Sequence, residues 1–217
     1  MEVGIVGGTG PAGRGLGLRL AAAGVAVASG SRDPARAVQV VGEAIAPWSD
    51  RLGGSIAGVG NEEAAEAGIV VLATPWDSAA ATAAALAGAL QGKVLVSMAN
   101  ALVRQGREMI ALVPARGSIA AAVQAAVPEA KVSAAFHHLP AREMADLDSG
   151  LIADVLVCAD DAEATAQTMS LVERIEGLRP LDAGSLAQAA AIEAFTAVCV
   201  TLNMRHRAHS TLKLAGI

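Results

Sequence analysis

Three glycines close to the N-terminus, Gly8, Gly10 and Gly13, have the spacing G-x-G-x-x-G, which suits the binding of a dinucleotide. We expect the first to allow a tight turn, the second to let the backbone approach a pyrophosphate, and the third to let a helix pack closely on a strand. The motif directly follows the apolar run 3–6 and directly precedes a helical pattern. A helix that begins here would direct its unpaired N–H groups at the anion. A glycine-rich turn without this strand and helix would be a weak signal.

The end of the predicted second strand, residues 25–29, indicates which dinucleotide binds. Ser31 and Arg32 follow this strand, and no acid stands where NAD enzymes carry an Asp or Glu for the ribose 2′-hydroxyl. A hydroxyl and a guanidinium suit a 2′-phosphate instead, and Arg36 lies one helical turn beyond Arg32 on the same face. Alternatively, Arg32 is a solvated surface residue and Asp33 supplies the acid. Because a proline follows Asp33, that residue is more typical of a helix N-cap, so we favour NADP.

The elements that must position these residues alternate between strand-like and helical patterns. Strand-like runs are at residues 3–6, 25–29, 56–59, 69–73, 94–97, 132–135 and 154–159. Helical patterns are at residues 11–23, 34–46, 61–67, 77–90, 118–126 and 162–175. Such alternation predicts an α/β fold, a Rossmann-type doubly wound parallel sheet with helices on both faces. In this fold the loops beyond the carboxyl ends of the strands bind the ligand.

The pattern changes at Ser185, so we predict a Rossmann domain at residues 1–184 and a small C-terminal helical segment at residues 185–217. The C-terminal helix has an apolar face and few strongly polar residues elsewhere. A second copy of the chain would cover this face, which predicts a homodimer and a segment that helps to close the pocket. The alternative is that the protein's own sheet covers the helix. The face comprises Leu186, Ala189, Ile192, Phe195, Cys199 and Leu202.

Composition limits the partners. The chain has 217 residues, a net charge of −5 and only 17% charged residues, so neither nucleic acid nor an anionic membrane should attract it. We therefore expect small-molecule partners. No basic and apolar leader precedes the first strand, and the apolar stretch 189–202 is too short to span a bilayer, so we expect a cytoplasmic protein. The two cysteines have no metal-ligand spacing, and the pair His137-His138 lacks a third ligand nearby, so no metal site is predicted.

Six separated blocks of the sequence carry a family resemblance. They are GGTGPAGRGLGLRLA, SGSRDPARA, ATPWDSA, VSMAN, HHLPA and EGLRPLDAGSL. Together they resemble the NADPH-dependent reductases of the deazaflavin coenzyme F420, over nearly the whole chain. The resemblance implies a Rossmann domain with a small C-terminal helical part, which passes a hydride between NADP and coenzyme F420. Two positions depart from the family's pattern, because His138 replaces a small or hydroxyl residue and Ala101 replaces a common proline.

The resemblance also assigns roles to residues in these blocks. It places the pyrophosphate against the glycine-rich turn of Gly8 and Gly13, at Thr9, Gly10, Pro11 and Ala12. It places the 2′-phosphate against Ser31, Arg32 and Arg36. It places the nicotinamide beside Thr74, Ser78 and Asn100, in loops that follow the strands 69–73 and 94–97. It places the deazaflavin against the loop of His137, Leu139 and Ala141, with His137 as a catalytic residue that acts by positioning. Alternatively, His137 only satisfies a backbone group.

Direct hydride transfer needs two rings stacked at contact distance in a site that excludes water, so positioning supplies most of the catalysis. The chain contains no tyrosine, which excludes the Tyr-x-x-x-Lys pair of short-chain dehydrogenases. Two alternatives stay open. An NADPH-dependent imine or ketone reductase would need a proton donor, for which His137 is the candidate. A non-catalytic NADP-sensing regulator would bind the dinucleotide without turnover.

A run of basic and titratable residues, 205–213, follows the apolar helix. In the F420 reductases the deazaflavin carries an anionic phosphate and a glutamate tail, so this run could hold the tail at the mouth of the pocket. Alternatively, the cations gather at a helix C-terminus because the macrodipole favours them there. The two hypotheses predict different responses of coenzyme F420 binding to salt.

Overall fold

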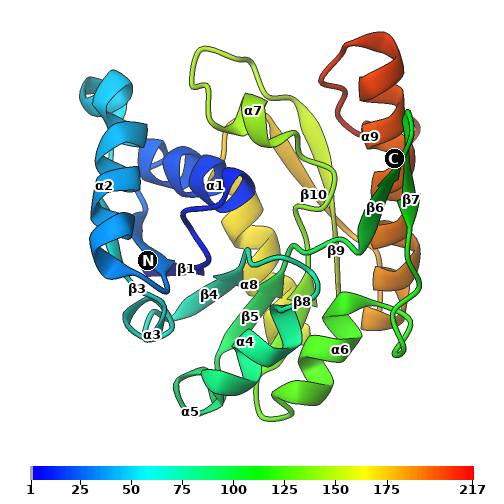
Figure 1. Ribbon diagram of the computed structural model, residues 1–217, viewed down its shortest axis with the longest axis horizontal. Helices are drawn as coiled ribbons and strands as arrows, with labels where there is room; N and C mark the ends of the chain where they lie inside the picture. Colours follow the sequence, from blue (N-terminus) through cyan, green and yellow to red (C-terminus); the bar gives the residue numbers. More distant parts are fainter. Residues whose placement is uncertain (1) are drawn as a thin grey trace.

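The computed structural model describes residues 2–217 and contains one eight-stranded sheet with helices on both faces (Figure 1). The strands lie in the order β10-β9-β8-β5-β4-β1-β2-β3. They are β1 (Glu2–Val6), β2 (Ala26–Ser31), β3 (Ile56–Gly60), β4 (Ile69–Leu72), β5 (Val94–Ser97), β8 (Lys131–Ala134), β9 (Ala153–Ala159) and β10 (Leu178–Asp182). A separate hairpin joins β6 (Leu102–Gln105) and β7 (Glu108–Ala111).

Nine α-helices are present in residues 2–217, and most connect consecutive strands of the sheet. They are α1 (Pro11–Ala22), α2 (Pro34–Ile45), α3 (Asn61–Ala64), α4 (Ala79–Ala85), α5 (Ala87–Leu90), α6 (Ile119–Ala126), α7 (Ala141–Met144), α8 (Ala162–Glu173) and α9 (Ala189–His206). Short 3₁₀ turns precede β3 and α9, at Ala46–Arg51 and Leu186–Gln188. The predicted α/β, doubly wound Rossmann-type fold is confirmed, because β1 pairs in parallel with both β2 and β4 and the order reverses between them.

Strand β9 corrects the expectation of a wholly parallel sheet, because it runs antiparallel to β8. A parallel neighbour requires a crossover that returns the chain along one face of the sheet. The connection between Ala134 and Ala153 contains only the helical turn α7, which packs on α1 instead of crossing the sheet. The chain therefore enters β9 from the edge at which it left β8. Helix α8 then provides a crossover, and β10 pairs in parallel with β9.

The sequence patterns did not predict three strands and misplaced the bounds of two helices. Strand β10 contains Pro180 and lies at the edge of the sheet, where a missing ladder N–H is tolerated. The hairpin β6–β7 is polar on much of its surface and turns at Gly106, whose φ is 61°. The predicted helix 77–90 begins only at Ala79 and is interrupted at Leu86, and the predicted helix 61–67 ends at Ala64.

Two hydrophobic cores lie on opposite faces of the sheet. In β4, Ile69 and Val71 face the core built with α1 and α8, whereas Val70 and Leu72 face the core built with α4, α6 and α9. This alternation follows from the two-residue period of a strand. Because both faces are covered, the carboxyl edge of the sheet is a rigid support for the loops beyond it.

Helix α9 lies beside β7 and α6, at the side of the molecule away from α2 (Figure 1). The helical stretch Leu186–His206 has 21 residues and is long and apolar enough, by length and composition alone, to cross a membrane. The expectation that this segment is too short was therefore wrong, because the helix starts earlier and ends later than residues 189–202. One face of α9, including Ile192, Glu193 and Thr196, is buried against the rest of the chain.

Candidate functional site

A cavity of about 670 Å³ opens beyond the carboxyl ends of β1, β2 and β4, where the strand order reverses. Doubly wound sheets bind ligands at this switch point. Eight of the residues singled out in the sequence line the cavity, namely Thr9, Gly10, Pro11, Ser31, Arg32, Arg36, Thr74 and Ser78. Gly8, Ala12 and Gly13 belong to the same turn but do not line it. Asn100, His137, Leu139 and Ala141 also lie outside its wall.

The glycine-rich turn folds tightly, but Gly7 makes the turn where we expected Gly8 to make it. Gly7 has a φ of 79°, which favours glycine, and its N–H donates to Asn61 Oδ1 at 3.1 Å. Gly8 is instead packed against β2, since a Cβ there would lie 2.3 Å from Ser29 Oγ. The sequence motif also gave no sign of Asn61, the buried side chain in α3 that holds the turn.

Helix α1 begins at the cavity and leaves its N-terminus open. Gly10 is the N-cap residue, Pro11 is the first helical residue, and no side chain caps the helix. The first N–H groups of α1 are therefore available to an anion, which the helix dipole also attracts. Gly13 keeps the helix close to the turn, since a Cβ there would lie 2.9 Å from the Cα of Gly8.

The other end of the cavity is basic. Arg32 and Arg36 are exposed on its wall, and in residues 2–217 neither has a carboxylate within ion-pair distance. Asp33 is the N-cap of α2, as predicted, because its carboxylate accepts the N–H of Arg36 at 3.2 Å. Ser31 Oγ accepts the N–H of Asp33 at 3.2 Å. This end therefore offers two guanidinium groups and a hydroxyl. Asp33, which follows β2, is engaged as the N-cap of α2, and Glu62 of α3 is the acid that lines the cavity.

The loop after β4 contributes a side chain that lacks a partner. Thr74 Oγ1 is buried in the cavity wall and makes no hydrogen bond within the described part of the chain. Ser78 is different, because its hydroxyl donates to the Pro75 carbonyl at 3.1 Å. A buried hydroxyl without a partner is costly, so Thr74 is expected to bind a ligand group or water. Together with the open α1 N-terminus and the basic end, this hydroxyl shows that the cavity fits an NADP molecule.

Asn100 and His137 lie together in the loops after β5 and β8, and neither lines the cavity. Asn100 Nδ2 donates to the His137 carbonyl at 3.3 Å, and Asn100 Oδ1 accepts the hydroxyl of Thr196 at 3.1 Å. Both ends of the Asn100 amide thus make contacts within the protein. His137 is 5% exposed, and neither of its buried ring nitrogens makes a hydrogen bond of good geometry.

Burial lowers the pKa of His137 to about 3, with a further lowering from His138 and an opposing effect of the Met98 backbone. The ring is therefore neutral near pH 7. A neutral imidazole at this position can orient a ligand or the loop, but it holds no proton in excess to donate as an imidazolium ion.

His138 lies in the loop after β8 and packs against α9. This residue, which departs from the family's pattern, therefore has a structural role. Its Nε2 donates to the Ile192 carbonyl at 3.0 Å, so the proton resides on that nitrogen. The ring also meets the edge of Phe195, with centroids 5.5 Å apart at 80°. Burial lowers the pKa of His138 as well. The departure from the family's pattern at this position thus joins α9 to the predicted deazaflavin loop.

Arg19 in α1 holds the loop that follows β8 in place, and no sequence motif indicated this contact. Its Nε donates to the Met144 carbonyl at 3.2 Å, and its Nη2 donates to the carbonyls of Glu143 at 2.7 Å and Ser149 at 2.8 Å. Gly15 makes the close approach possible, since a Cβ there would lie 2.7 Å from Met144 Cβ. The loop of Leu139 and Ala141 is therefore docked on the same helix whose N-terminus opens into the cavity.

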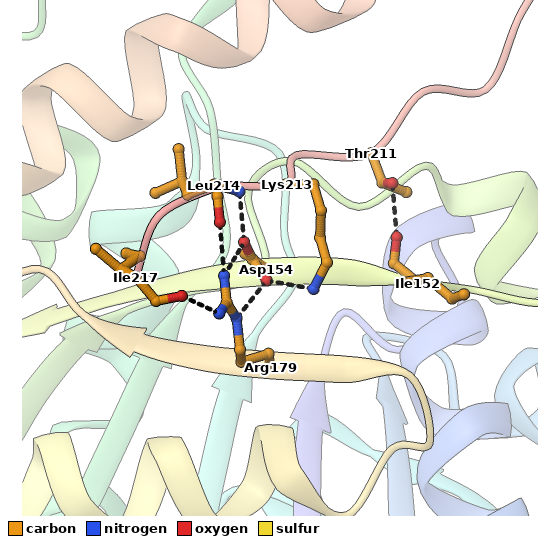
Figure 2. A network of polar contacts seen from close by, with 7 residues as sticks. All are labelled: Ile152, Asp154, Arg179, Thr211, Lys213, Leu214 and Ile217. Atoms are coloured by element: carbon orange, nitrogen blue, oxygen red, sulfur yellow. Dashed lines mark hydrogen bonds and ion pairs between the residues drawn. The ribbon is translucent and has the colours of Figure 1, made fainter.

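Two cations of the C-terminal basic run are already paired. Figure 2 shows Asp154, buried in β9, between Arg179 of β10 and Lys213 of the C-terminal tail. Lys213 Nζ lies 2.8 Å from Asp154 Oδ1, and the Leu214 N–H donates to Oδ2 at 2.6 Å. The hydrogen bonds from Arg179, foremost, hold the pKa of Asp154 far below its usual range.

Arg205 pairs with Glu108 of β7. With Lys213 bound to Asp154, this arrangement favours the structural alternative for the basic run, because both cations already have carboxylate partners. Arg205 and His206 occupy the last turn of α9, where the helix dipole favours cations.

The doubly wound sheet and a cavity that is basic at one end define a Rossmann-type dinucleotide-binding oxidoreductase. The sequence profile of a family described as NADP oxidoreductase coenzyme F420-dependent matches residues 2–101. An F420-dependent NADP reductase of Methanocaldococcus jannaschii is 34% identical over 97% of this chain and 96% of its own. An enzyme of the same name from Methanothermobacter marburgensis is 32% identical over 100% of this chain and 97% of its own. The chain belongs to the family of F420-dependent NADP reductases.

A solved structure agrees with this assignment. A protein from Arthrobacter sp. FB24, assigned to the F420-dependent NADP reductases, has a TM-score of 0.81 and 27% identity, with 100% of both chains covered. The likeness extends through the C-terminal segment as well as the Rossmann part. The resemblance identified from the six sequence blocks is therefore confirmed.

Proposed function

We propose that this protein transfers a hydride between NADP(H) and coenzyme F420. The observation that carries the proposal is the likeness to F420-dependent NADP reductases over nearly the full length of the chain. Bound NADPH supplies the hydride and the deazaflavin accepts it, together with one proton from solvent. The protein's own residues bind the two molecules, align their rings and exclude water.

The dinucleotide is held in the cavity at the switch point. Its pyrophosphate lies at the open N-terminus of α1, against Thr9 and Gly10. Its 2′-phosphate lies at the basic end, where Arg32 and Arg36 have no carboxylate partner in residues 2–217. Its nicotinamide lies toward Thr74, whose buried hydroxyl needs a partner. With these residues holding the nucleotide, its nicotinamide end would lie near the loop that follows β4.

The deazaflavin binds against the loop of Leu139 and Ala141. His137 acts here by positioning, since its ring is neutral and buried. Asn100 supports the same loop through its hydrogen bond to the His137 carbonyl, so its role is to position this loop. The imine or ketone reductase alternative is not favoured, because His137 cannot serve as the required cationic acid near pH 7. The sensor alternative is not favoured either, because relatives that match the whole chain are named as reductases.

The protein works as a homodimer in the cytoplasm, with residues 185–217 as the dimerising segment and part of the pocket closure. Its outer face is apolar, since Phe195 is 42%, Val198 49% and Leu202 45% exposed on α9. Val103 and Ile110, which pair across the adjacent hairpin, are also exposed. A second copy would bury it, which favours self-association over binding to nucleic acid or membrane.

The direct experiment mixes the protein with NADPH and oxidised coenzyme F420 and follows the visible absorbance of the deazaflavin. Bleaching that depends on protein and NADPH is the expected result. NADH serves as the control donor. If NADPH binds but oxidised coenzyme F420 is not bleached, and reduced coenzyme F420 with NADP+ does not regain its absorbance, the proposed function is wrong.

A further inference from the structure

Thr196 on α9 contacts the two loops of the proposed acceptor site, which follow β5 and β8. The residue is buried, and its hydroxyl lies 3.1 Å from Asn100 Oδ1 and 3.3 Å from the His137 carbonyl. Its own helix offers the competing Ile192 carbonyl at 3.4 Å. A hydroxyl has one proton, and the shortest of these contacts is the one to Asn100. The hydroxyl therefore orients the Asn100 amide, whose NH₂ group then donates to the His137 carbonyl.

The backbone that these groups hold is strained. Phe136, directly before His137, has a φ of 66°, which is a rare conformation for a residue with a side chain. Phe136 is also buried, and its strain persists only if the surroundings fix the neighbouring peptide groups. The bond from Asn100 fixes the carbonyl of the next residue. The backbone of Leu139, three residues beyond Phe136, continues from this point into the predicted deazaflavin loop.

We infer that Thr196 is a positioning residue for hydride transfer, which rests on the proposed function. Through Asn100, its hydroxyl holds the His137 carbonyl and the left-handed turn at Phe136, and thereby the loop that faces the deazaflavin. Helix α9 is thus part of the acceptor site although none of its residues lines the cavity. The hydrogen bond from His138 to Ile192 is a second link between the same helix and loop.

The matched test uses two threonines of α9. Thr196→Val removes the hydroxyl and nearly keeps the volume, whereas Thr196→Ser keeps the hydroxyl. Thr201→Val is the control, because Thr201 Oγ1 accepts the Met109 N–H at 2.9 Å and so bonds to the hairpin instead of the acceptor loop. We expect Thr196→Val to lower kcat with coenzyme F420 about ten-fold and leave the dissociation constant of NADPH unchanged. Thr196→Ser and Thr201→Val should retain most of the wild-type kcat.

Amide hydrogen exchange without ligands gives a readout that does not depend on turnover. Thr196→Val should speed exchange in peptides covering residues 135–140, and Thr201→Val should speed it in peptides covering residues 106–112. Wild-type kcat and wild-type exchange in Thr196→Val would overturn the inference. An equal loss of kcat in Thr201→Val would also overturn it, because general packing of α9 would then explain the effect. If the wild type oxidises no NADPH with coenzyme F420, only the proposed function fails, and exchange still decides whether Thr196 holds the loop.

Discussion

Asp154 in β9 and Arg179 in β10 form a two-pronged ion pair, in which Nε lies 2.8 Å from Oδ1 and Nη2 lies 2.7 Å from Oδ2 (Figure 2). The carboxylate is buried, and Arg179 also donates to the carbonyls of Leu214 and Ile217 at 2.9 and 2.7 Å. This pair therefore joins the antiparallel part of the sheet to the C-terminal tail. Removal of the carboxylate would leave two cations and the Leu214 N–H without their common partner.

Asp154 should make the protein sensitive to acid. The pKa of Asp154 is lower in the folded protein than in the unfolded chain, where it is about 4. Its contribution to stability is therefore complete above pH ~4 and is lost progressively as the pH falls below that value. Asp154→Asn should lower the melting temperature at pH 7 by several degrees and flatten its decline below pH ~4. Parallel pH-dependence curves for the two proteins would contradict this role.

Arg32 should determine the preference for NADP(H). Arg32→Ala removes a charge-assisted contact worth roughly 1.5–3 kcal/mol, so the dissociation constant of NADPH should rise at least ten-fold. The dissociation constant of NADH should be nearly unchanged, because NADH has no 2′-phosphate. Fluorescence titration with both nucleotides measures this. Equal affinity of the wild-type protein for NADPH and NADH would place the phosphate elsewhere.

Arg19 should hold the loop after β8 on α1. Arg19→Met keeps much of the aliphatic stem and removes the guanidinium, so several carbonyls between residues 143 and 149 lose their donor. We expect a loss of about 2 kcal/mol in the free energy of unfolding, because hydrogen bonds to a charged group are lost and some carbonyls regain water. Limited proteolysis should cut first within residues 141–149 of the variant. Unchanged stability with the same cleavage pattern as wild type would show that packing alone holds the loop.

His137 should contribute a second, separate dependence on pH. Its folded pKa of about 3 lies below the value near 6.5 expected in the unfolded chain. Between these values the unfolded chain binds a proton that the folded protein does not, so stability falls as the pH decreases from ~6.5, by roughly 1.4 kcal/mol per pH unit. His137→Gln should reduce this slope between pH 6 and 4.5. Denaturant unfolding at a series of pH values measures it, and an unchanged slope would assign the proton uptake to other groups.

The sequence by itself determined the N-terminal βαβ unit and its ligand. Its signals are local: an apolar run, the spacing of Gly8, Gly10 and Gly13, and the Asp33 N-cap all act within a few residues. The same is true of Ser31 and Arg32, because their place at the end of β2 follows from the strand itself. The six sequence blocks that resemble the F420 reductases are also short and continuous, so they could be recognised without the structure. The comparison with relatives confirms this resemblance over nearly the whole chain.

Only the tertiary structure decided how the second half of the site is built. Arg19 binds carbonyls 124 to 130 residues away, and a carbonyl that accepts a hydrogen bond leaves no mark in the sequence. Thr196 meets Asn100 across 96 residues, and Lys213 meets Asp154 across 59. The antiparallel direction of β9 depended on whether α7 crossed the sheet or docked on α1, which is a packing choice between distant surfaces. The periodicity of apolar residues indicates whether a side chain is buried or exposed. Which distant residue that side chain contacts depends on the whole fold.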